Sequence, residues 1–365
     1  MLITLSILVL LGAAAFFYLT LNPQFGGGVQ KEDLERFQAS PQWDRKQFEN
    51  QTPAVMEVSL KTLPGLLREQ RQNKPLRSPE IDLPILNFSI EALSKDPNVT
   101  QFAWFGHSAL FLRIAGKNIL IDPMLGPDAA PIGPIRSPRF SANGLAILEQ
   151  LPELDAVLFT HDHYDHLDYK SLKIIAPKTK KFLVALGVGR HLRSWKVPSE
   201  KIQEFDWWDE TLLDELQITA TPSRHFSGRG LFDRGKSLWC GWVFKSNAHS
   251  IYWSGDGGYD THFQNIGEKL GPFDWSFIEC GQYHDLWHDI HLFPEESVQA
   301  AIEAKSKIAS PVHWAGFSLS PHPWKDPYER FTKAAEEAKL QSFIPKLGAL
   351  VTVSPEPAKE QNWKP

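Results

Sequence analysis

The stretch AVLFTHDHYDH, residues 156–166, joins a short apolar strand to a loop crowded with metal-ligating side chains. Residues two apart in an extended chain face the same side, so His161 and His163 can converge on one metal ion. A turn then directs Asp165 and His166 toward a second centre. Neutral imidazoles suit zinc, iron and similar metals, and a carboxylate completes a hard, hydrolytic site. The stretch therefore predicts a metal centre after a buried strand, and the alternative is a polar loop whose histidines cap the next helix.

The other ligands of such a centre should also lie at strand ends, because the metal ions are reached from one rim of the fold. Three candidates follow short predicted strands, namely His225, Asp256 and His313. Each of them alone also has an ordinary interpretation as a core or surface residue. Their shared position after a strand favours all three together as ligands.

Strands and helices alternate over the body of the chain. We expect strands at 102–105, 109–114, 119–121, 156–159, 217–220, 239–244, 250–253, 275–279 and 308–312. We expect amphipathic helices at 295–305 and 327–339. A mixed series of this kind predicts a layered α/β domain.

Composition narrows the class of protein further. The chain has 365 residues, of which 42% are hydrophobic and 22% charged, and this globular composition excludes wholesale disorder and fibrous repeats. A formal net charge of −5 argues against a nucleic-acid partner, since nucleic-acid binders usually carry a basic excess. The two cysteines, Cys240 and Cys280, cannot build a disulfide framework, so the fold must depend on its own core.

The N-terminal residues 2–21 carry no charge and are long enough, as a helix, to cross a bilayer. A cleaved signal peptide is the main alternative, and the small residues 13–15 would be its cleavage site. Against it, no basic residue precedes the run, and the apolar residues continue past 13–15. A buried helix is the second alternative. An anchor predicts membrane association, at the inner membrane if the source is bacterial. Lys31 and Arg36 after the run favour a cytoplasmic catalytic domain, but two charges leave the side of the membrane open.

The motif at 161–166 matches the H-x-H-x-D-H signature of the metallo-β-lactamase fold. Within that superfamily the chain resembles N-acyl-phosphatidylethanolamine-hydrolysing phospholipase D and its bacterial relatives. The resemblance covers about residues 75–353, and further similar stretches are GHS at 106–108, RSP at 136–138, TPSRH at 221–225, GDGGY at 255–259 and HW at 313–314. It implies a four-layer αββα sandwich with a dinuclear metal site between two sheets.

The predicted anchor and the extent of the resemblance divide the chain into three segments. Residues 1–28 are expected to form the membrane anchor and a flexible, Gly-rich break. Residues 29–84, which are polar and rich in Gln and Pro, are expected as an extended arm that covers the domain. Residues 85–355 are expected to form the metallo-β-lactamase-fold hydrolase domain.

The resemblance also implies a role for each candidate residue. One zinc ion would be bound by His161, His163 and His225, and a second by Asp165, His166 and His313, with Asp256 bridging the two. The implied catalytic residues are Asp256 and His291, the latter in the substrate pocket just before a Pro-Glu-Glu helix start. His284 and His288 stand at helical spacing from His291, and a further metal face there is the less favoured interpretation.

Three more residues are candidates for contacts around the metal ions or the substrate. Asp122, after its strand, is placed to orient a ligand imidazole, although it has an equally good interpretation as a turn cap. Arg136 and Arg139, in a loop rich in Pro and Gly, are candidates to hold a lipid phosphate. A solvated surface loop is the alternative for both arginines.

The implied activity is that of a metal-dependent phosphodiesterase of phospholipase D type, acting through a dinuclear zinc-activated hydroxide. Its substrate would be N-acyl phosphatidylethanolamine or a related membrane phospholipid, and its partners a phospholipid and a membrane rather than nucleic acid. The alternatives are a hydrolase of a small ester or sugar-phosphate lactone, and a non-catalytic membrane-anchored binding protein. Iron or manganese in place of zinc stays open.

Overall fold

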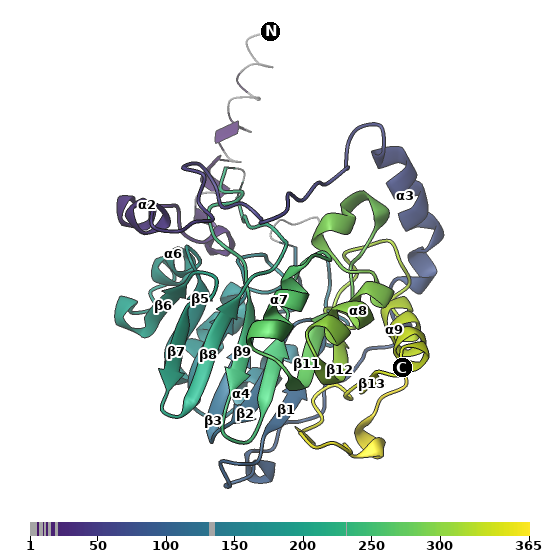
Figure 1. The fold of residues 1–365 in the computed structure, drawn as a ribbon. Helices are drawn as coiled ribbons and strands as arrows, with labels where there is room; N and C mark the ends of the chain where they lie inside the picture. The colour runs from purple at the N-terminus through teal and green to yellow at the C-terminus, as the bar shows by residue number, and fades with distance from the viewer. Residues whose placement is uncertain are drawn as a thin grey trace.

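The computed structural model describes residues 21–130, 136–230 and 232–365, together with residues 16–18 and Ser6, Leu10, Gly12 and Ala13. In this part of the chain, two mixed sheets of seven strands lie face to face (Figure 1). The first has the strand order β14-β1-β2-β3-β4-β5-β6, and the second β13-β12-β11-β10-β9-β8-β7. The predicted layered α/β fold is confirmed.

The strands of the first sheet are β1 (Gln101–Trp104), β2 (Leu110–Ile114), β3 (Lys117–Ile121), β4 (Leu154–Phe159), β5 (Thr179–Ala185), β6 (Ile202–Phe205) and β14 (Val351–Thr352). The strands of the second are β7 (Glu210–Leu213), β8 (Leu216–Thr221), β9 (Gly241–Lys245), β10 (Ser250–Trp253), β11 (Phe273–Glu279), β12 (Ser306–Val312) and β13 (Gln341–Ser342). In each sheet an antiparallel half continues into a parallel half, which begins at the β3–β4 pair and the β10–β11 pair.

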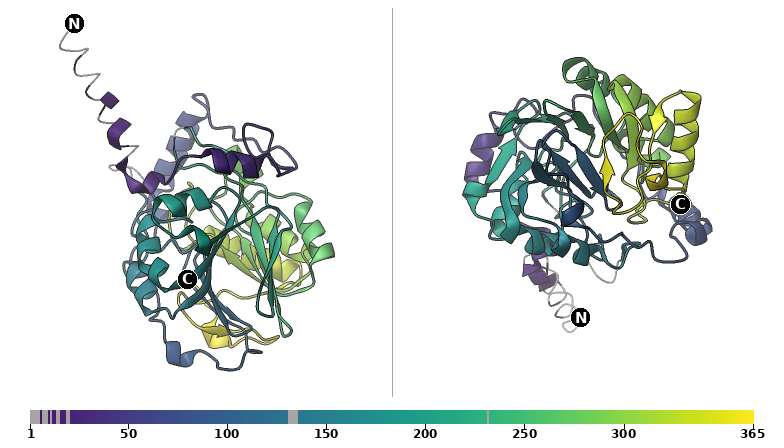
Figure 2. Two further views of the ribbon diagram at one scale, coloured as in Figure 1. Left: turned by 90° about the vertical axis from the view of Figure 1, so that its left-hand side faces the viewer. Right: turned by 90° about the horizontal axis from the view of Figure 1, so that it is seen from below.

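Helices cover the outer faces of both sheets (Figure 2). Apolar side chains of α4 (Gly144–Gln150), α5 (Tyr169–Ile175) and α6 (Gly189–Ser194) join the core of the first sheet. Those of α7 (His262–Lys269), α8 (Pro294–Glu303) and α9 (Asp326–Glu337) pack on the second sheet. The two helices expected near the C-terminus are thus confirmed as α8 and α9, each shifted by one or two residues.

Aromatic side chains join the two sheets in the centre of the molecule. The ring of Phe102 on β1 lies 4.9 Å from each of the rings of Trp275 and Phe277 on β11. Phe205 on β6 lies 5.4 Å from Trp242 on β9. Edge-to-face pairs of this kind bury large apolar areas and add directional contacts, so they hold the sheets at a fixed distance.

The predicted anchor, residues 2–21, lies for the most part outside the described residues. Among the helices that the structure does describe, none is both long enough and apolar enough to cross a membrane.

Residues 22–28, which we expected to be a flexible break, are bound to the domain. Trp195 Nε1 donates a 2.7 Å hydrogen bond to the carbonyl oxygen of Pro23, within the short 3-10 helix η1 (Pro23–Phe25). Gly26 has φ +72°, and a Cβ there would lie 2.0 Å from His191 Nδ1. The glycines allow the backbone of this segment to lie close against the domain. A glycine-rich composition is equally typical of a flexible linker, so composition alone does not distinguish the two.

Residues 29–84 contain the helices α2 (Lys31–Phe37) and α3 (Leu63–Gln72). The ring of Phe37 at the end of α2 is fully buried and lies 5.0 Å from the rings of both Trp43 and Phe48. This segment therefore contributes to the main core as well as covering it.

The burial of Phe37 gives a test of whether this segment belongs to the folded unit. We expect Phe37→Ala to lower the free energy of unfolding by about 3–5 kcal/mol, because it leaves a cavity in a packed cluster. The control is Leu34→Ala on the exposed side of the same helix, for which we expect a change within about 0.5 kcal/mol. Urea unfolding measures both, and equal values would show that α2 is not part of the cooperative core.

Candidate metal centre

The predicted ligands come together from four strand ends. His161, His163, Asp165 and His166 lie on the loop that follows β4, while His225, Asp256 and His313 follow β8, β10 and β12. Their side chains form two neighbouring clusters, the first of which contains His161, His163 and His225 and the second Asp165, His166 and His313. The structure thus brings together the residues that the strand-end positions and the resemblance singled out, and their role as metal ligands stays a prediction.

In the first cluster the ring nitrogens face one another. His163 Nδ1 lies 2.8 Å from His161 Nε2 and 3.2 Å from His225 Nε2. A tetrahedral zinc ion with bonds of about 2.0–2.1 Å places its ligand nitrogens about 3.3 Å apart. The spacing of these three nitrogens is therefore close to what one metal ion needs.

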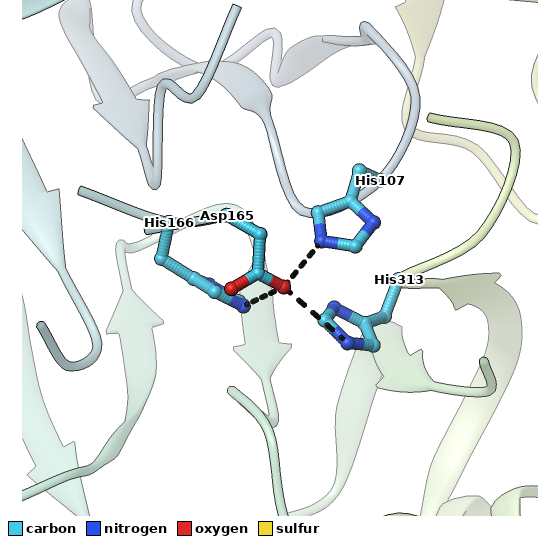
Figure 3. A group of neighbouring side chains, drawn as sticks. All are labelled: His107, Asp165, His166 and His313. Carbon is cyan, nitrogen blue, oxygen red and sulfur yellow. Dashed lines mark hydrogen bonds and ion pairs between the residues drawn. The ribbon is translucent and has the colours of Figure 1, made fainter. Parts of the chain in front are cut away.

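The second cluster is centred on the carboxylate of Asp165 (Figure 3). Its Oδ2 atom lies 3.6 Å from His166 Nε2 and 3.9 Å from His313 Nε2. A third imidazole completes the group, since His107 Nε2 lies 2.8 Å from the same oxygen.

Asp256 lies between the two clusters. Its Oδ2 atom is 3.0 Å from His166 Nε2, 3.2 Å from His313 Nε2 and 4.0 Å from His225 Nε2. One carboxylate oxygen is thus within reach of ligands from both groups, as a bridging residue would be.

The outward nitrogen of each of four ligand histidines is held by a neighbouring group. The pairs are His161 with Thr160 Oγ1 at 2.9 Å, His166 with Asp122 Oδ2 at 3.0 Å, His225 with the Ile290 carbonyl at 3.0 Å, and His313 with Ser108 Oγ at 2.9 Å. A carboxylate and a carbonyl only accept, so Nδ1 of His166 and of His225 carries a proton. Nε2 of each ring then faces the site, where a metal ion would bind it in its unprotonated form. Such contacts typically orient metal-ligating imidazoles. Asp122 stands where we expected it, beside a ligand ring.

Electrostatics also fit a bound cation. Burial lowers the pKa values of His161, His225 and His313 well below the ordinary value, so these imidazoles are neutral as metal ligands must be. Burial raises the pKa of Asp256 to about 6. Neither Asp165 nor Asp256 forms an ion pair with a Lys or Arg side chain of the described residues. Buried carboxylates among nitrogen donors, with no sulfur ligand, suit zinc, iron or manganese.

His107 and Glu279 are the site residues that the sequence analysis missed. His107 follows β1 by three residues, so the strand-end rule used for the other ligands would have found it. Burial lowers its pKa to about 4. Glu279 ends β11, and its carboxylate accepts hydrogen bonds from His291 Nδ1 and, at 3.1 Å, from the backbone N–H of Leu292.

His291 lies beside the clusters, with its ring stacked on that of His313 at 5.3 Å and edge-to-face with that of His225 at 5.2 Å. The other two histidines of this segment are engaged elsewhere. His284 contacts Glu69 at 2.9 Å, and His288 contacts Glu296 at 2.7 Å. The less favoured metal face of His284, His288 and His291 therefore does not form.

The structure does not bring the two arginine candidates into the site. Arg139 is buried, and its guanidinium donates to backbone carbonyls, including that of Met124 at 2.6 Å and that of Phe105. It supports the turn that carries His107. Arg136 is largely exposed and pairs with Asp128. Sequence alone does not reveal that backbone carbonyls accept hydrogen bonds from both terminal nitrogens of this buried guanidinium.

The chain is a metallo-hydrolase and belongs to the beta-lactamase superfamily, whose domain model matches residues 117–314. An uncharacterized protein of Mycobacterium tuberculosis is 41% identical over 260 residues, which are 70% of this chain and 69% of the relative. N-acyl-phosphatidylethanolamine-hydrolyzing phospholipase D 1 of Caenorhabditis elegans is 29% identical over 76% of this chain and 83% of its own. The structure of Igni18, a metallo hydrolase from Ignicoccus hospitalis, shares the fold with a TM-score of 0.56 at 22% identity, covering 70% of this chain and 99% of that one.

The position of Asp256 predicts the effect of removing its charge. We expect wild-type protein to retain about two metal ions per chain after dialysis, and Asp256→Asn to bind at least one of them about 10-fold more weakly. The control is Asp285→Asn, an exposed residue near the site, for which we expect no change. Elemental analysis with a chelator titration measures both, and equal metal content in the two variants would exclude the bridging position.

Proposed function

We propose that this protein is a metal-dependent phosphodiesterase of phospholipase D type that hydrolyses N-acyl phosphatidylethanolamine or a related membrane phospholipid. The observation that carries the proposal is the pair of buried clusters joined by Asp256. The relationship to a phospholipase D from Caenorhabditis elegans supports the choice of substrate.

The proposed zinc ligands are the seven predicted ones. They are His161, His163, His225, Asp165, His166, His313 and the bridging Asp256. A bound pair of metal ions would lower the pKa of a shared water molecule and neutralise charge on the phosphoryl oxygens.

Two side chains are proposed to act in proton transfer. Asp256 faces both clusters, so its carboxylate is placed to take the proton of the attacking water. His291 donates its Nδ1–H to Glu279 beside the ring of His313. Its unprotonated Nε2 is therefore proposed to receive the proton that Asp256 takes from the water and to pass it to the leaving oxygen of the substrate.

A cavity of about 250 Å³ opens beside His225 and supports the assignment of a lipid substrate. Phe226, Trp239 and Pro53 contribute apolar walls, and Arg234 contributes a cation. The lining also includes the polar residues Gln47, Glu49 and Asn50. Arg234 forms no ion pair with an acidic residue among those described, and its guanidinium lies 4.2 Å from the ring centroid of Phe226. We propose that this arginine, rather than Arg136 or Arg139, contacts the substrate phosphate.

The arm carries a row of exposed apolar side chains next to this cavity. It is fixed to the site by the N–H of Glu57, which donates to the Leu286 carbonyl at 2.7 Å, and then exposes Val58 and Leu60, the latter 90% exposed. Phe232, at 91% exposure, lies two residues from Arg234. In Figure 1 the arm, coloured from purple to blue, crosses one end of the molecule between α2 and α3. Exposed apolar groups gathered beside a cavity suit contact with a lipid surface.

We therefore propose that the protein works at a membrane. Residues 1–28 provide the N-terminal anchor, residues 29–84 the arm that faces the lipid, and residues 85–355 the hydrolase domain. An enzyme attached to the membrane can hydrolyse a phospholipid that does not leave the bilayer, so the proposed anchor is consistent with the proposed substrate.

The test of the reaction is lipid mass spectrometry. Zinc-loaded protein is incubated with vesicles that contain N-acyl phosphatidylethanolamine, and we expect phosphatidic acid and an N-acylethanolamine to accumulate. A chelator and the Asp256→Asn variant should both abolish this turnover. If no phospholipid changes while a small ester or lactone is hydrolysed, the phospholipase D assignment is wrong.

The apolar arm gives a prediction of its own. We expect Leu60→Glu combined with Phe232→Glu to lower the rate on vesicles at least about 10-fold, since two buried carboxylates disfavour insertion among lipids, and to leave hydrolysis of a soluble ester unchanged. The control is Leu212→Glu, an exposed residue on the edge strand β7. Loss of vesicle activity in the control as well would contradict a specific lipid-facing surface.

A further inference from the structure

Residues 22–28 are bound by side chains that also bind the metal loop, which we define as residues 160–168. Three of these side chains, Arg190, His191 and Arg229, are buried. Arg190 Nε donates to the Gly27 carbonyl at 3.1 Å, and its Nη2 lies 3.3 Å from Asp162 Oδ2. The segment that leads out of the predicted anchor is thus connected to the metal loop through single side chains.

Arg229 makes the most extensive of these connections. Its Nε and Nη2 atoms donate to the Gln24 carbonyl at 3.0 and 2.6 Å. Its Nη1 atom donates to the carbonyls of Asp162 at 2.6 Å and Leu167 at 2.8 Å. The guanidinium also lies 4.1 Å from the ring centroid of Tyr164. One planar, rigid group therefore holds the segment against both ends of the H-x-H-x-D-H motif.

His191 makes a second connection, and its hydrogen bonds define its tautomer. The backbone N–H of Gly27 donates to His191 Nδ1 at 3.1 Å, so Nδ1 is unprotonated. The proton is on Nε2, which donates to Asp162 Oδ2 at 3.1 Å. Asp162 stands between the ligands His161 and His163. The N–H of Gly27 thus determines which nitrogen of His191 supports the metal loop.

This contact requires glycine at one position and not at another. A Cβ on Gly26 would lie 2.0 Å from His191 Nδ1, and its φ of +72° is strained for any other residue type. A Cβ on Gly28 would have no described atom within 4 Å. Alanine at Gly26 should therefore disturb the docking of the segment on His191, whereas alanine at Gly28 removes a glycine without disturbing that contact.

We propose that residues 22–27 are a positioning element of the metal centre. By holding Arg229 and His191 against the metal loop, they keep His161 and His163 at the spacing that a metal ion needs. This inference rests on the proposed metal centre but not on the identity of the substrate. It also means that the predicted anchor joins the domain through contacts that reach the metal ligands.

The test compares Gly26→Ala with its matched control Gly28→Ala. Zinc is titrated into the metal-free full-length protein in competition with a chelating dye. We expect Gly26→Ala to weaken zinc binding about 10-fold or more, the usual effect of losing support behind a metal ligand. We expect Gly28→Ala to bind zinc as the wild type does. Equal affinities in the two variants would overturn the proposal.

A second series distinguishes positioning from general loss of stability. Lysine retains a donor for the loop carbonyls and methionine retains none, so we expect zinc affinity to fall in the order wild type, Arg229→Lys, Arg229→Met. The thermal unfolding midpoint of each metal-free variant is measured alongside. Affinities that follow only that midpoint, or that do not differ, contradict the proposal. Wild-type protein that binds zinc but hydrolyses no phospholipid would contradict the proposed function and leave this inference standing.

Discussion

The packing of two carboxylates, the buried Asp256 and the partly buried Asp165, among imidazoles at the meeting edge of two sheets is the constraint on which the site depends. A buried charge without a partner costs several kcal/mol, so such a cluster persists only where cations or hydrogen bonds compensate it. Among the described residues no Lys or Arg reaches these carboxylates. The cation beside them is the ring of His166, because Asp256, Asp165 and Asp122 raise its pKa well above the ordinary value against the effect of burial. The proposed pair of metal ions would add to this compensation.

Three residues of the site have a left-handed backbone conformation. His107, Asp122 and His313 have φ values of 55°, 41° and 68°, in the left-handed region that residues other than glycine rarely adopt. Each such residue costs about 1–2 kcal/mol relative to ordinary backbone. All three lie just after a strand, where the sharp change of direction turns the side chain into the space between the sheets. Side-chain hydrogen bonds such as those of Asp122 with Thr160 and His166 offset this cost.

The sequence predicts those parts of the fold that depend on residues close to one another in the chain. The apolar run of β4 and the ligand-rich loop after it are adjacent in the chain, so the strand and four of the ligands are readable together. The strand-end rule also located His225, Asp256 and His313. By contrast β5 was not predicted, because Lys180 and Lys181 interrupt its apolar pattern. The role of Arg139 and the docking of residues 22–28 depend on partners far along the chain, which a local pattern does not contain.

Anomalous X-ray diffraction from crystals of the metal-loaded protein tests most directly whether a dinuclear centre is divided between the two clusters. We expect two anomalous peaks about 3.5–4 Å apart. One peak should lie among His161, His163 and His225, and the other among Asp165, His166 and His313, with Asp256 in contact with both. A single peak, or peaks bound to other residues, would contradict this arrangement.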